Sequence, residues 1–166
     1  MFTCLLAMSL FTATTNNDVD KALIDLVKGG TIVTLSSNYL GTPFGTPAPY
    51  AIDSEGRPVL FLSDLAIHTK NIRKNPKCSI MVLKEDKEDP FNSARVTFIG
   101  KMVKVNDKER AEYKKLFIGK QKTAEWFSDL EDFNYYRLEI ESIFYVGGFG
   151  DIQWIEPKDY VKGIKK

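Results

Sequence analysis

The sequence predicts a mainly β protein, an antiparallel barrel with helices at its edges. Three observations support this fold class: six segments have strand-like apolar patterns, short turns join several of them as hairpins, and few segments have helical periodicity. With 166 residues the chain is long enough for one domain with a substantial core and too short for two domains of usual size. We therefore expect an N-terminal arm, residues 1–17, and a single domain, residues 18–166.

The first part of the domain is predicted to contain a helix and a strand. Asn17 or Asp18 is placed to cap a helix that ends at Lys28, before a pair of glycines. A strand follows at residues 31–36. The next segment is expected to lack a regular ladder until the strand at 50–52, because glycine and proline interrupt it. These residues are Gly41, Pro43, Gly45, Pro47 and Pro49.

The middle of the chain is predicted to form a hairpin strand, a short helix and another strand. A turn at residues 53–56 leads into a strand at 58–63. Asp64 is then expected to cap a short helix, which ends before Pro76. An apolar run at 78–83 is the next strand.

The second half is predicted to contain two long strands separated by helices. Residues 95–105 alternate well enough for a long strand, with a bulge or bend at Gly100. Asp107 is expected to cap a charged amphipathic helix, and a second helical piece surrounds Trp126. The last strand, 135–150, alternates apolar and charged residues, as a half-buried antiparallel strand requires.

Composition excludes several function classes. Twenty-three basic and 22 acidic residues leave a net charge of +1, so no global field favours nucleic acid or a membrane, and any anion site must be local. One histidine and the separated Cys4 and Cys78 argue against a metal site and fit a reducing, cytoplasmic compartment. The apolar start, MFTCLLAMSLFTATTNN, faintly resembles a secretory signal but lacks basic residues, so we expect a packed arm.

The stretch LSDLAIHTKNIRKNP holds the best candidate for an anion site. A helix that begins just after a strand offers free N–H groups and the positive end of its dipole. Ser63 and Thr69 add hydroxyl donors, while His68 and Lys70 add charge-assisted donors. The alternative is a histidine at the edge of the core beside an ordinary solvated basic face.

Two other segments are candidate ligand contacts. In GTPAPY the prolines at 47 and 49 lack N–H groups, which leaves neighbouring backbone groups free to meet the edge of a flat heteroaromatic ring. An edge strand protected by prolines explains this segment equally well. Arg95 opens a long strand, and Phe149, among glycines, is the best candidate for a stacking ring.

No other catalytic motif is present. The chain has neither a GxxxxGK nor a GxGxxG loop and no nucleophile elbow, and we assign no catalytic residue. Redox chemistry would therefore come from a bound cofactor.

Three segments resemble the pyridoxamine 5'-phosphate oxidase-like, FMN-binding split-barrel superfamily, and within it the haem iron utilisation branch. They are GTPFGTPAPYAIDSEGRPVLFLSDLAIHTKNIRKNPKCSIMV, RVTFIGKMVKV and YYRLEIESIFYVGGFGDIQWI. The resemblance covers residues 19–155 and implies a six-stranded split barrel that forms a homodimer, with two FMN molecules in clefts between the subunits.

The resemblance also implies cofactor contacts. The backbone of Gly45, Thr46, Pro47, Ala48, Pro49 and Tyr50 would follow the isoalloxazine edge. Leu62 and Ser63 would border the ribityl phosphate, and His68, Thr69 and Lys70 would stand where the oxidases bind phosphate. Arg95 and Tyr145 would contribute contacts at the dimer interface.

Departures from the family pattern leave three functions open. His68-Thr69 replaces the Arg-Lys pair of the oxidases, and the C-terminal residues that hold their substrate phosphate have no clear counterpart, so pyridoxamine phosphate oxidation is not expected. The first hypothesis is an FMN-binding oxidoreductase of unknown substrate. The alternative is a haem-binding or haem-degrading protein, in which His68 is the only available imidazole. The third is a non-catalytic dimer with filled clefts.

The expected homodimer also has a physical reason. Trp126, Phe127, Trp154 and many other aromatic residues exceed what one small core hides, and large exposed apolar patches are rare on monomers. The other expected partner is a small-molecule redox substrate.

Overall fold

The computed structural model describes residues 16–166, with side chains from Lys21 onward. Most of the expected N-terminal arm, including Cys4, lies outside the described residues, and Asn16 and Asn17 already belong to the first helix. The strands are β1 (Ile32–Tyr39), β2 (Thr42–Ile52), β3 (Pro58–Ser63), β4 (Lys77–Lys84), β5 (Ala94–Lys104), β6 (Phe133–Gly148) and β7 (Asp151–Ile155). The helices are α1 (Asn16–Gly29), α2 (Ile67–Lys74), α3 (Arg110–Lys120) and α4 (Pro157–Ile164), with 3-10 turns η1 (Pro90–Asn92) and η2 (Lys122–Phe127). Within residues 16–166, no helix is long and apolar enough to cross a membrane.

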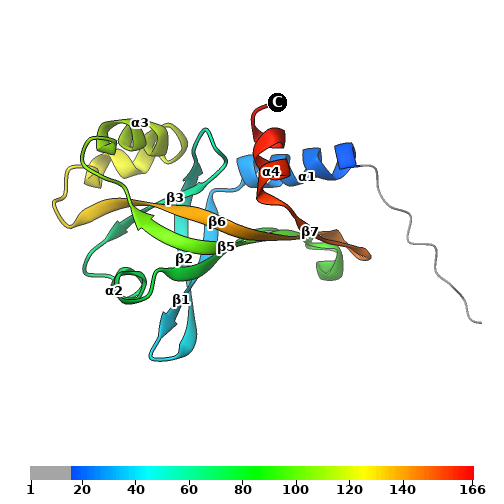
Figure 1. Cartoon of the computed structure of the whole chain (residues 1–166), viewed down its shortest axis with the longest axis horizontal. Helices are drawn as coiled ribbons and strands as arrows, with labels where there is room; N and C mark the ends of the chain where they lie inside the picture. Colours follow the sequence, from blue (N-terminus) through cyan, green and yellow to red (C-terminus); the bar gives the residue numbers. More distant parts are fainter. Residues whose placement is uncertain (1–15) are drawn as a thin grey trace, which may run out of the picture.

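Six strands form a closed ring in the order β3, β2, β1, β4, β5, β6, because β3 pairs with β6 as well as with β2 (Figure 1). Every pairing is antiparallel. One edge of β6 pairs with β5, while its other edge pairs first with β3 and then, after a gap, with β7. The barrel is therefore split along β6, and the predicted six-stranded antiparallel split barrel is confirmed, with β7 as an additional strand.

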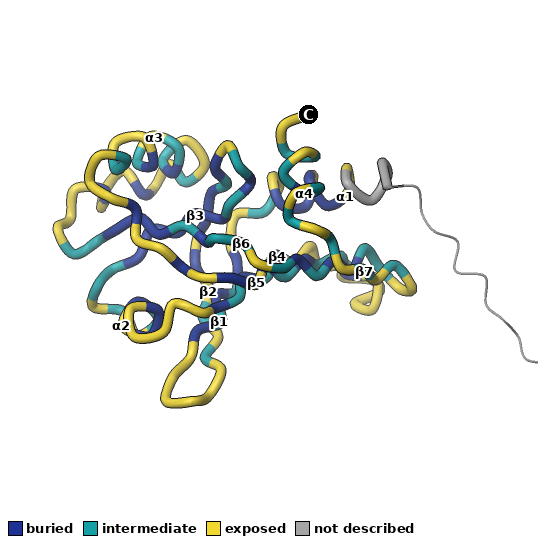
Figure 2. Tube along the Cα trace, viewed as in Figure 1, coloured by how far each residue is buried: buried dark blue, intermediate teal, exposed yellow. Residues whose placement is uncertain are grey.

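A continuous apolar core fills the ring and extends beneath α1 and α4. Figure 2 shows buried residues along the strands of the barrel and in α1. Leu35, Leu60, Ile80 and Phe98, from four different strands, are completely buried. The apolar side of α1 supplies Leu23, Leu26 and Val27 to this core. A helix packed by such a stripe is stabilised mainly by tertiary burial rather than by its own propensity.

A second apolar cluster, which was not predicted, lies on the outer side of β3 and β6 beneath α3 and η2. Phe61 stacks on Tyr135 with ring centroids 4.4 Å apart, and Phe117 of α3 packs against both rings. Aromatic pairs of this kind contribute beyond their buried area. This wall of the barrel is consequently buried on both faces, so alternation along β3 disappears and all five residues from Pro58 to Leu62 are buried.

The expectation that glycine and proline interrupt the ladder before residue 50 was wrong. β2 pairs continuously with β1 from Thr42 to Pro49. The N–H of Tyr50 donates to the carbonyl of Thr31, so even-numbered residues of β2 direct their N–H groups toward β1. All three prolines occupy odd positions, where the missing N–H would have pointed to the opposite edge. Among the described residues, no strand pairs with that edge until β3 joins it at Tyr50.

Gly100 confirms the predicted bulge. The register between β5 and β6 shifts between Ile99 and Gly100. A Cβ added at Gly100 would lie 2.0 Å from the carbonyl oxygen of Glu139, a distance that no side chain permits. Glycine is therefore required at this bulge.

Several boundaries differ from the predictions. Neither β7 nor α4 was predicted; Ile152 and Trp154 of β7 alternate as in a strand, but they are exposed on the outside. Asp64 does not cap α2, whose N-cap is Ala66 without a side-chain bond. Asp107 does not cap α3 either, since the N-cap is Glu109 without a side-chain bond. The N–H of Glu109 donates to the carboxamide oxygen of Asn106.

Candidate functional site

Strand β2 and helix α2 meet at the corner where the sequence predicted a ligand site. The Oγ1 of Thr46 lies 3.2 Å from the Nδ1 of His68, which links the GTPAPY strand to the helix across 22 positions. Two segments predicted independently to contact a ligand are thus neighbours. We call the region around Thr46, Ser63 and His68 the β2–α2 corner.

His68 is a neutral imidazole in this environment. The side chain is half-buried, and desolvation lowers its pKa from the ordinary value of 6.5. The lowered pKa favours the neutral form at pH 7, which weakens any charge-assisted bond to a phosphate. When Nδ1 donates to Thr46, Nε2 holds a lone pair and is available as a metal ligand.

The hydroxyl of Ser63 is already engaged within the chain. It donates to Oδ2 of Asp132 at 2.6 Å and accepts from the N–H of Leu65 at 3.1 Å. The N–H of Asp64 also donates to the carbonyl of Asp132 at 2.7 Å. A phosphate at this point would have to displace Asp132 and approach its carboxylate, which is an unfavourable environment for an anion.

Thr69 and Lys70 differ sharply in accessibility. Thr69 is completely buried, and its Oγ1 has no hydrogen-bond partner among the described residues. Lys70 is exposed. Its N–H donates to the carbonyl of Ala66, four residues earlier, and is the first N–H in α2 to form a helical hydrogen bond. The N–H groups of the preceding helical residues therefore lack intrahelical partners.

The remaining residues of the predicted β2 contact alternate in orientation. Gly45, Pro47 and Pro49 are exposed, whereas Ala48 and Tyr50 are buried in the core. The hydroxyl of Tyr50 donates to the carbonyl of Val27 at 2.6 Å, so this side chain supports α1. Leu62 likewise points into the core. Only the backbone of these buried residues is available to a ligand.

Arg95, Tyr145 and Phe149 lie away from the corner within one chain. Tyr145 is buried beneath α1, in a groove that Ala22, Leu26 and Gly147 also line. Arg95 donates to the carbonyl of Ser93. Phe149 is 88% exposed, and its N–H donates to Asn92 of the neighbouring loop.

Arg95 nevertheless shares one outward surface with the exposed part of β2. Registered pairs align one row of outward residues across six strands: Pro47, Thr34, Met81, Thr97, Phe144 and Trp154. The adjoining row pairs Arg95 with Leu83 on one side and Val146 on the other. We call this surface the outer face. It exposes large apolar side chains, among them Ile32 at 59%, Ile152 at 55% and Trp154 at 66%.

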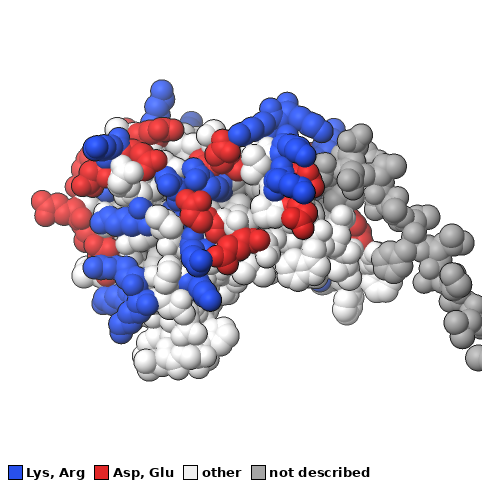
Figure 3. All heavy atoms as spheres, viewed as in Figure 1, with Lys and Arg blue, Asp and Glu red and all other residues white. Residues whose placement is uncertain are grey.

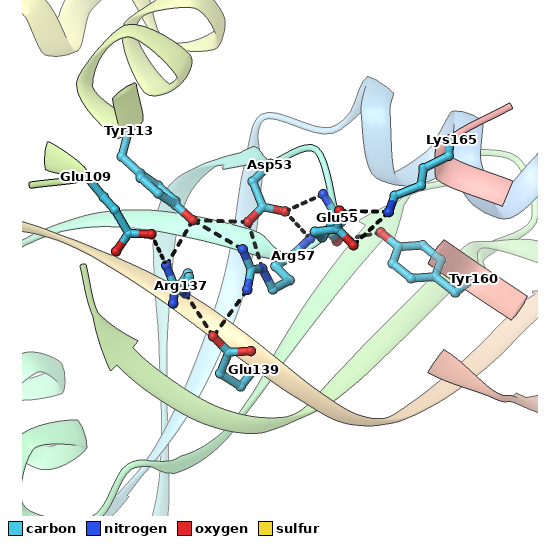
Figure 4. Close-up of polar contacts among 10 residues, drawn as sticks. Asp53, Glu55, Arg57, Glu109, Tyr113, Arg137, Glu139, Tyr160 and Lys165 are labelled. Carbon is cyan, nitrogen blue, oxygen red and sulfur yellow. Dashed lines mark hydrogen bonds and ion pairs between the residues drawn. The ribbon is translucent and has the colours of Figure 1, made fainter. Parts of the chain in front are cut away.

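A cluster of ionic side chains on the other side of the barrel is structural. The hydroxyl of Tyr113 lies within 3.3 Å of Asp53, Arg57 and Arg137 (Figure 4). Arg137 also pairs with Glu109 and Glu139. These contacts join α3 to the turn after β2 and to β6, and the guanidinium donors are directed to neighbouring carboxylates rather than to a ligand.

The residues that sequence reasoning missed are those brought to the corner by pairing between distant segments. Asp132 reaches Ser63 only because Phe133 is registered opposite Ser63 in the β3–β6 pair. Asp64 accepts from Asn134 and Tyr136 and lies 3.7 Å from Arg73. No local pattern indicates such contacts, because they depend on a pairing across about 70 positions.

A family model described as CREG, beta-barrel matches residues 12–162. The chain belongs to the CREG β-barrel family. Its sequence is 37% identical over 119 residues to the chloroplastic heme oxygenase HOZ of Arabidopsis thaliana, covering 72% of this chain and 36% of that protein. It is 31% identical to Protein CREG1 of Gallus gallus, covering 79% and 77%, and 32% identical to the heme oxygenase HutZ of Vibrio cholerae, covering 73% and 71%. The chain thus spans little more than a third of the Arabidopsis relative.

Solved structures show the same fold. A heme-binding protein from Mycobacterium smegmatis matches with a TM-score of 0.81 and 24% identity, covering 91% of this chain and 62% of that one. A putative pyridoxamine 5'-phosphate oxidase from Listeria innocua matches with a TM-score of 0.61 and 16% identity, covering 78% and 99%. The resemblance to the oxidase-like split barrels and to their haem utilisation branch is therefore confirmed, and the CREG β-barrel family is the more specific assignment.

Proposed function

We propose that this CREG-family barrel binds haem at the β2–α2 corner and takes part in haem degradation. The observation that carries the proposal is the state of His68, the only histidine in the chain: it is half-buried, neutral at pH 7 and held by Thr46 through one ring nitrogen. A ligand imidazole in proteins has these properties. Two relatives above 30% identity that are named heme oxygenases support the same function.

The surroundings of His68 suit the other parts of a haem. Leu65 and Ile67, beside it in the chain, are 73% and 45% exposed and offer apolar contact to a macrocycle. Lys70 and Arg73 lie on the exposed side of the same helix and would pair with the two propionates. Ile67, His68, Lys70 and Arg73 thus lie within about two turns of α2, and Leu65 lies just before the helix.

The protein's contribution to haem chemistry would be binding and orientation. Haem supplies the redox chemistry when it is supplied with electrons and O₂. His68 would hold the iron, Thr46 would fix the ring of His68, and the apolar residues would limit access of water to one face.

FMN is the second candidate, and a specific feature of β2 favours it. Between Thr42 and Pro49 no strand in the described part of the chain pairs with the outer edge of β2, which presents carbonyl groups and the N–H of Gly45. This pattern of acceptors and a donor suits the edge of a flavin ring. The phosphate end fits less well, because the hydroxyl of Ser63 is committed to Asp132 and His68 is neutral.

The proposal includes a homodimer formed through the outer face. This face exposes Ile32, Leu83, Ile152 and Trp154, and apolar area of this kind is usually covered by another protein surface. In one chain, two strands separate Arg95 on β5 from Pro47 on β2. A second copy seated on this face would bring its own Arg95 and apolar residues toward the corner.

The test is a titration of the purified protein with haem and, separately, with FMN, followed by absorption spectra. We expect saturable haem binding at one per chain, and loss of the haem band when reductant and O₂ are supplied. Saturable FMN binding with no haem binding would replace the proposed function by the flavoprotein alternative. Binding of neither would indicate a barrel without a cofactor.

A further inference from the structure

A surface of six exposed cations surrounds the C-terminal end of α2. Its members are Lys70, Arg73 and Lys74 of α2, Lys77 of β4, and Lys101 and Lys104 of β5. Arg73, Lys101 and Lys104 line one groove of about 450 Å³ whose floor includes Ile72, Met102 and Tyr136. We call these six residues the basic surface; Figure 3 shows Lys and Arg atoms gathered over the end of the barrel where α2 lies.

Few carboxylates compensate this charge. Arg73 lies 3.7 Å from Asp64, and Lys101 lies 2.9 Å from Glu141. Within the described part of the chain the other four cations have no carboxylate within 4.0 Å. Since the whole chain carries a net charge of only +1, the basic surface is a local concentration rather than a general excess.

One pair on this surface violates the usual rule for sheets. Lys77 of β4 is registered directly opposite Lys101 of β5. Like charges at opposed positions of an antiparallel pair destabilise the sheet. Glu141 compensates Lys101 at 2.9 Å, but Lys77 has no carboxylate within 4.0 Å among the described residues. An arrangement that is locally unfavourable for folding is expected at functional sites.

The basic surface adjoins the candidate haem site. Arg73 follows His68 by five residues on the same helix, which corresponds to about 8 Å along the axis. A protein docked on this surface would therefore lie close to the β2–α2 corner. Lys77 and Lys101 lie on the same outward side of β4 and β5 as Met81 and Thr97, so the basic surface adjoins the outer face used by the proposed dimer. Charge complementarity implies that such a protein is acidic.

We propose that the basic surface docks an acidic electron-carrier protein, which supplies electrons to the β2–α2 corner. This inference rests on the proposed function, because haem degradation consumes electrons that the side chains of this protein do not supply. The step is a one-electron transfer, in which the carrier is oxidised by one electron and the ferric iron of the substrate is reduced to ferrous iron. Electrostatic steering onto the surface would increase the rate of productive encounter.

The test measures docking apart from haem binding. The triple variant Lys74→Glu, Lys77→Glu, Lys104→Glu reverses three unpaired cations and leaves Lys70 and Arg73 intact. The matched control reverses three exposed lysines elsewhere, Lys115→Glu, Lys122→Glu and Lys158→Glu. The probes are an acidic flavodoxin and an acidic ferredoxin, and the association rate of each with the full-length, haem-free protein is measured at low and at physiological salt.

We expect at least one probe to bind the wild-type protein with a rate that falls steeply with salt. The triple variant should lower this association rate about 10- to 100-fold, while the control variant should not change it. Equal rates for the wild-type protein and the triple variant, or no binding of either probe, would overturn the inference. So would binding of a short DNA duplex or of phosphatidylserine vesicles that is lost in the triple variant while the carriers do not bind.

Haem titration of the same three proteins separates this inference from the proposed function. Equal haem affinity in all three, with docking lost only in the triple variant, supports both. A wild-type protein that binds no haem would refute the proposed function whatever the docking result.

Discussion

Thr46 and His68 are in hydrogen-bond contact, with Oγ1 of one 3.2 Å from Nδ1 of the other. The contact links strand β2 to helix α2 and fixes which nitrogen of the half-buried ring is free. The contact orients the ring, while burial lowers its pKa and favours the neutral form that a metal ligand needs. The proposed haem site depends on this pair more than on any other contact in the molecule.

Removing the hydroxyl from this pair should weaken haem binding without unfolding the barrel. Thr46→Val keeps the shape of the side chain but leaves His68 free to rotate, and loss of such an outer contact typically costs 10- to 100-fold in affinity. We expect about a tenfold higher Kd for haem. Thr42→Val, at an exposed position of the same strand, is the control and should bind as the wild type does. Equal affinity in both variants would show that Thr46 does not orient His68.

Haem affinity should depend on pH through His68. Desolvation lowers the pKa of this residue below 6.5, so the ring stays neutral from neutral pH down to that lowered pKa. Affinity should be constant above pH 6.5 and fall as the pH drops through the pKa of His68, because a protonated imidazole cannot ligate iron. Folding stability should change in the same direction, since the unfolded chain takes up this proton at a higher pH than the folded chain does. Haem titrations across the pH range check this prediction. The fall in affinity at low pH should be absent in His68→Gln.

The hydroxyl of Tyr113 should stabilise the attachment of α3 to the barrel. It contacts Asp53, Arg57 and Arg137, and burial raises its pKa, so it remains protonated throughout the physiological range. Tyr113→Phe should lower the free energy of unfolding by about 1–3 kcal/mol, because charged partners lose a hydrogen bond. Urea denaturation measures this change.

Tyr39→Phe is the control for this prediction. Tyr39 is 47% exposed, and its hydroxyl has no hydrogen bond among the described residues. The free energy of unfolding should change by less than about 0.5 kcal/mol. Similar values for the two variants would mean that the ionic cluster around Tyr113 contributes nothing to stability.

Two glycines should respond in opposite directions to alanine. At Gly100 the new Cβ would collide with the carbonyl of Glu139, so Gly100→Ala should destabilise the protein by about 3 kcal/mol or more, as other severe backbone conflicts do. At Gly119, in α3, nothing lies within 4 Å of the new Cβ, so Gly119→Ala should stabilise it by about 0.5–1 kcal/mol. Thermal unfolding of both variants tests the pair, and a stable Gly100→Ala protein would contradict the bulge assignment.

The outer face should control oligomeric state. Thr97 lies near the middle of its aligned row, and Thr97→Glu would place a charge where a second copy is proposed to sit. Sedimentation should show a dimer for the wild-type protein and a monomer for this variant at micromolar concentration. A monomeric wild-type protein would remove the shared-cleft model. Lys122→Glu, at an exposed position of η2, is the control and should leave the dimer intact.

Much of the fold was predictable because its signals are local. The bulge at Gly100, the alternation of β6 and the apolar stripe of α1 follow from patterns within a few residues of each other. The continuity of β2 was not predictable in the same way. Its prolines are tolerated because all of them face one unpaired edge, and sequence alone does not reveal which edge β3 leaves free.

The candidate site was predictable only in part. Sequence patterns predicted that β2 and the start of α2 contact a ligand. The Thr46–His68 contact shows that these two segments meet. The commitment of Ser63 to Asp132 depends on the pairing of β3 with β6, and the lowered pKa of His68 depends on its burial. Both properties arise from tertiary structure, and both shift the balance from phosphate toward haem.

The most direct test of the proposed haem site is a haem titration of the wild-type protein and of His68→Ala. The position and intensity of the haem absorption band are measured in both. We expect saturation at one haem per chain in the wild-type protein, and a shifted, weaker band with much lower affinity in His68→Ala. An identical band and affinity in the two proteins would contradict the assignment of His68 as the haem ligand.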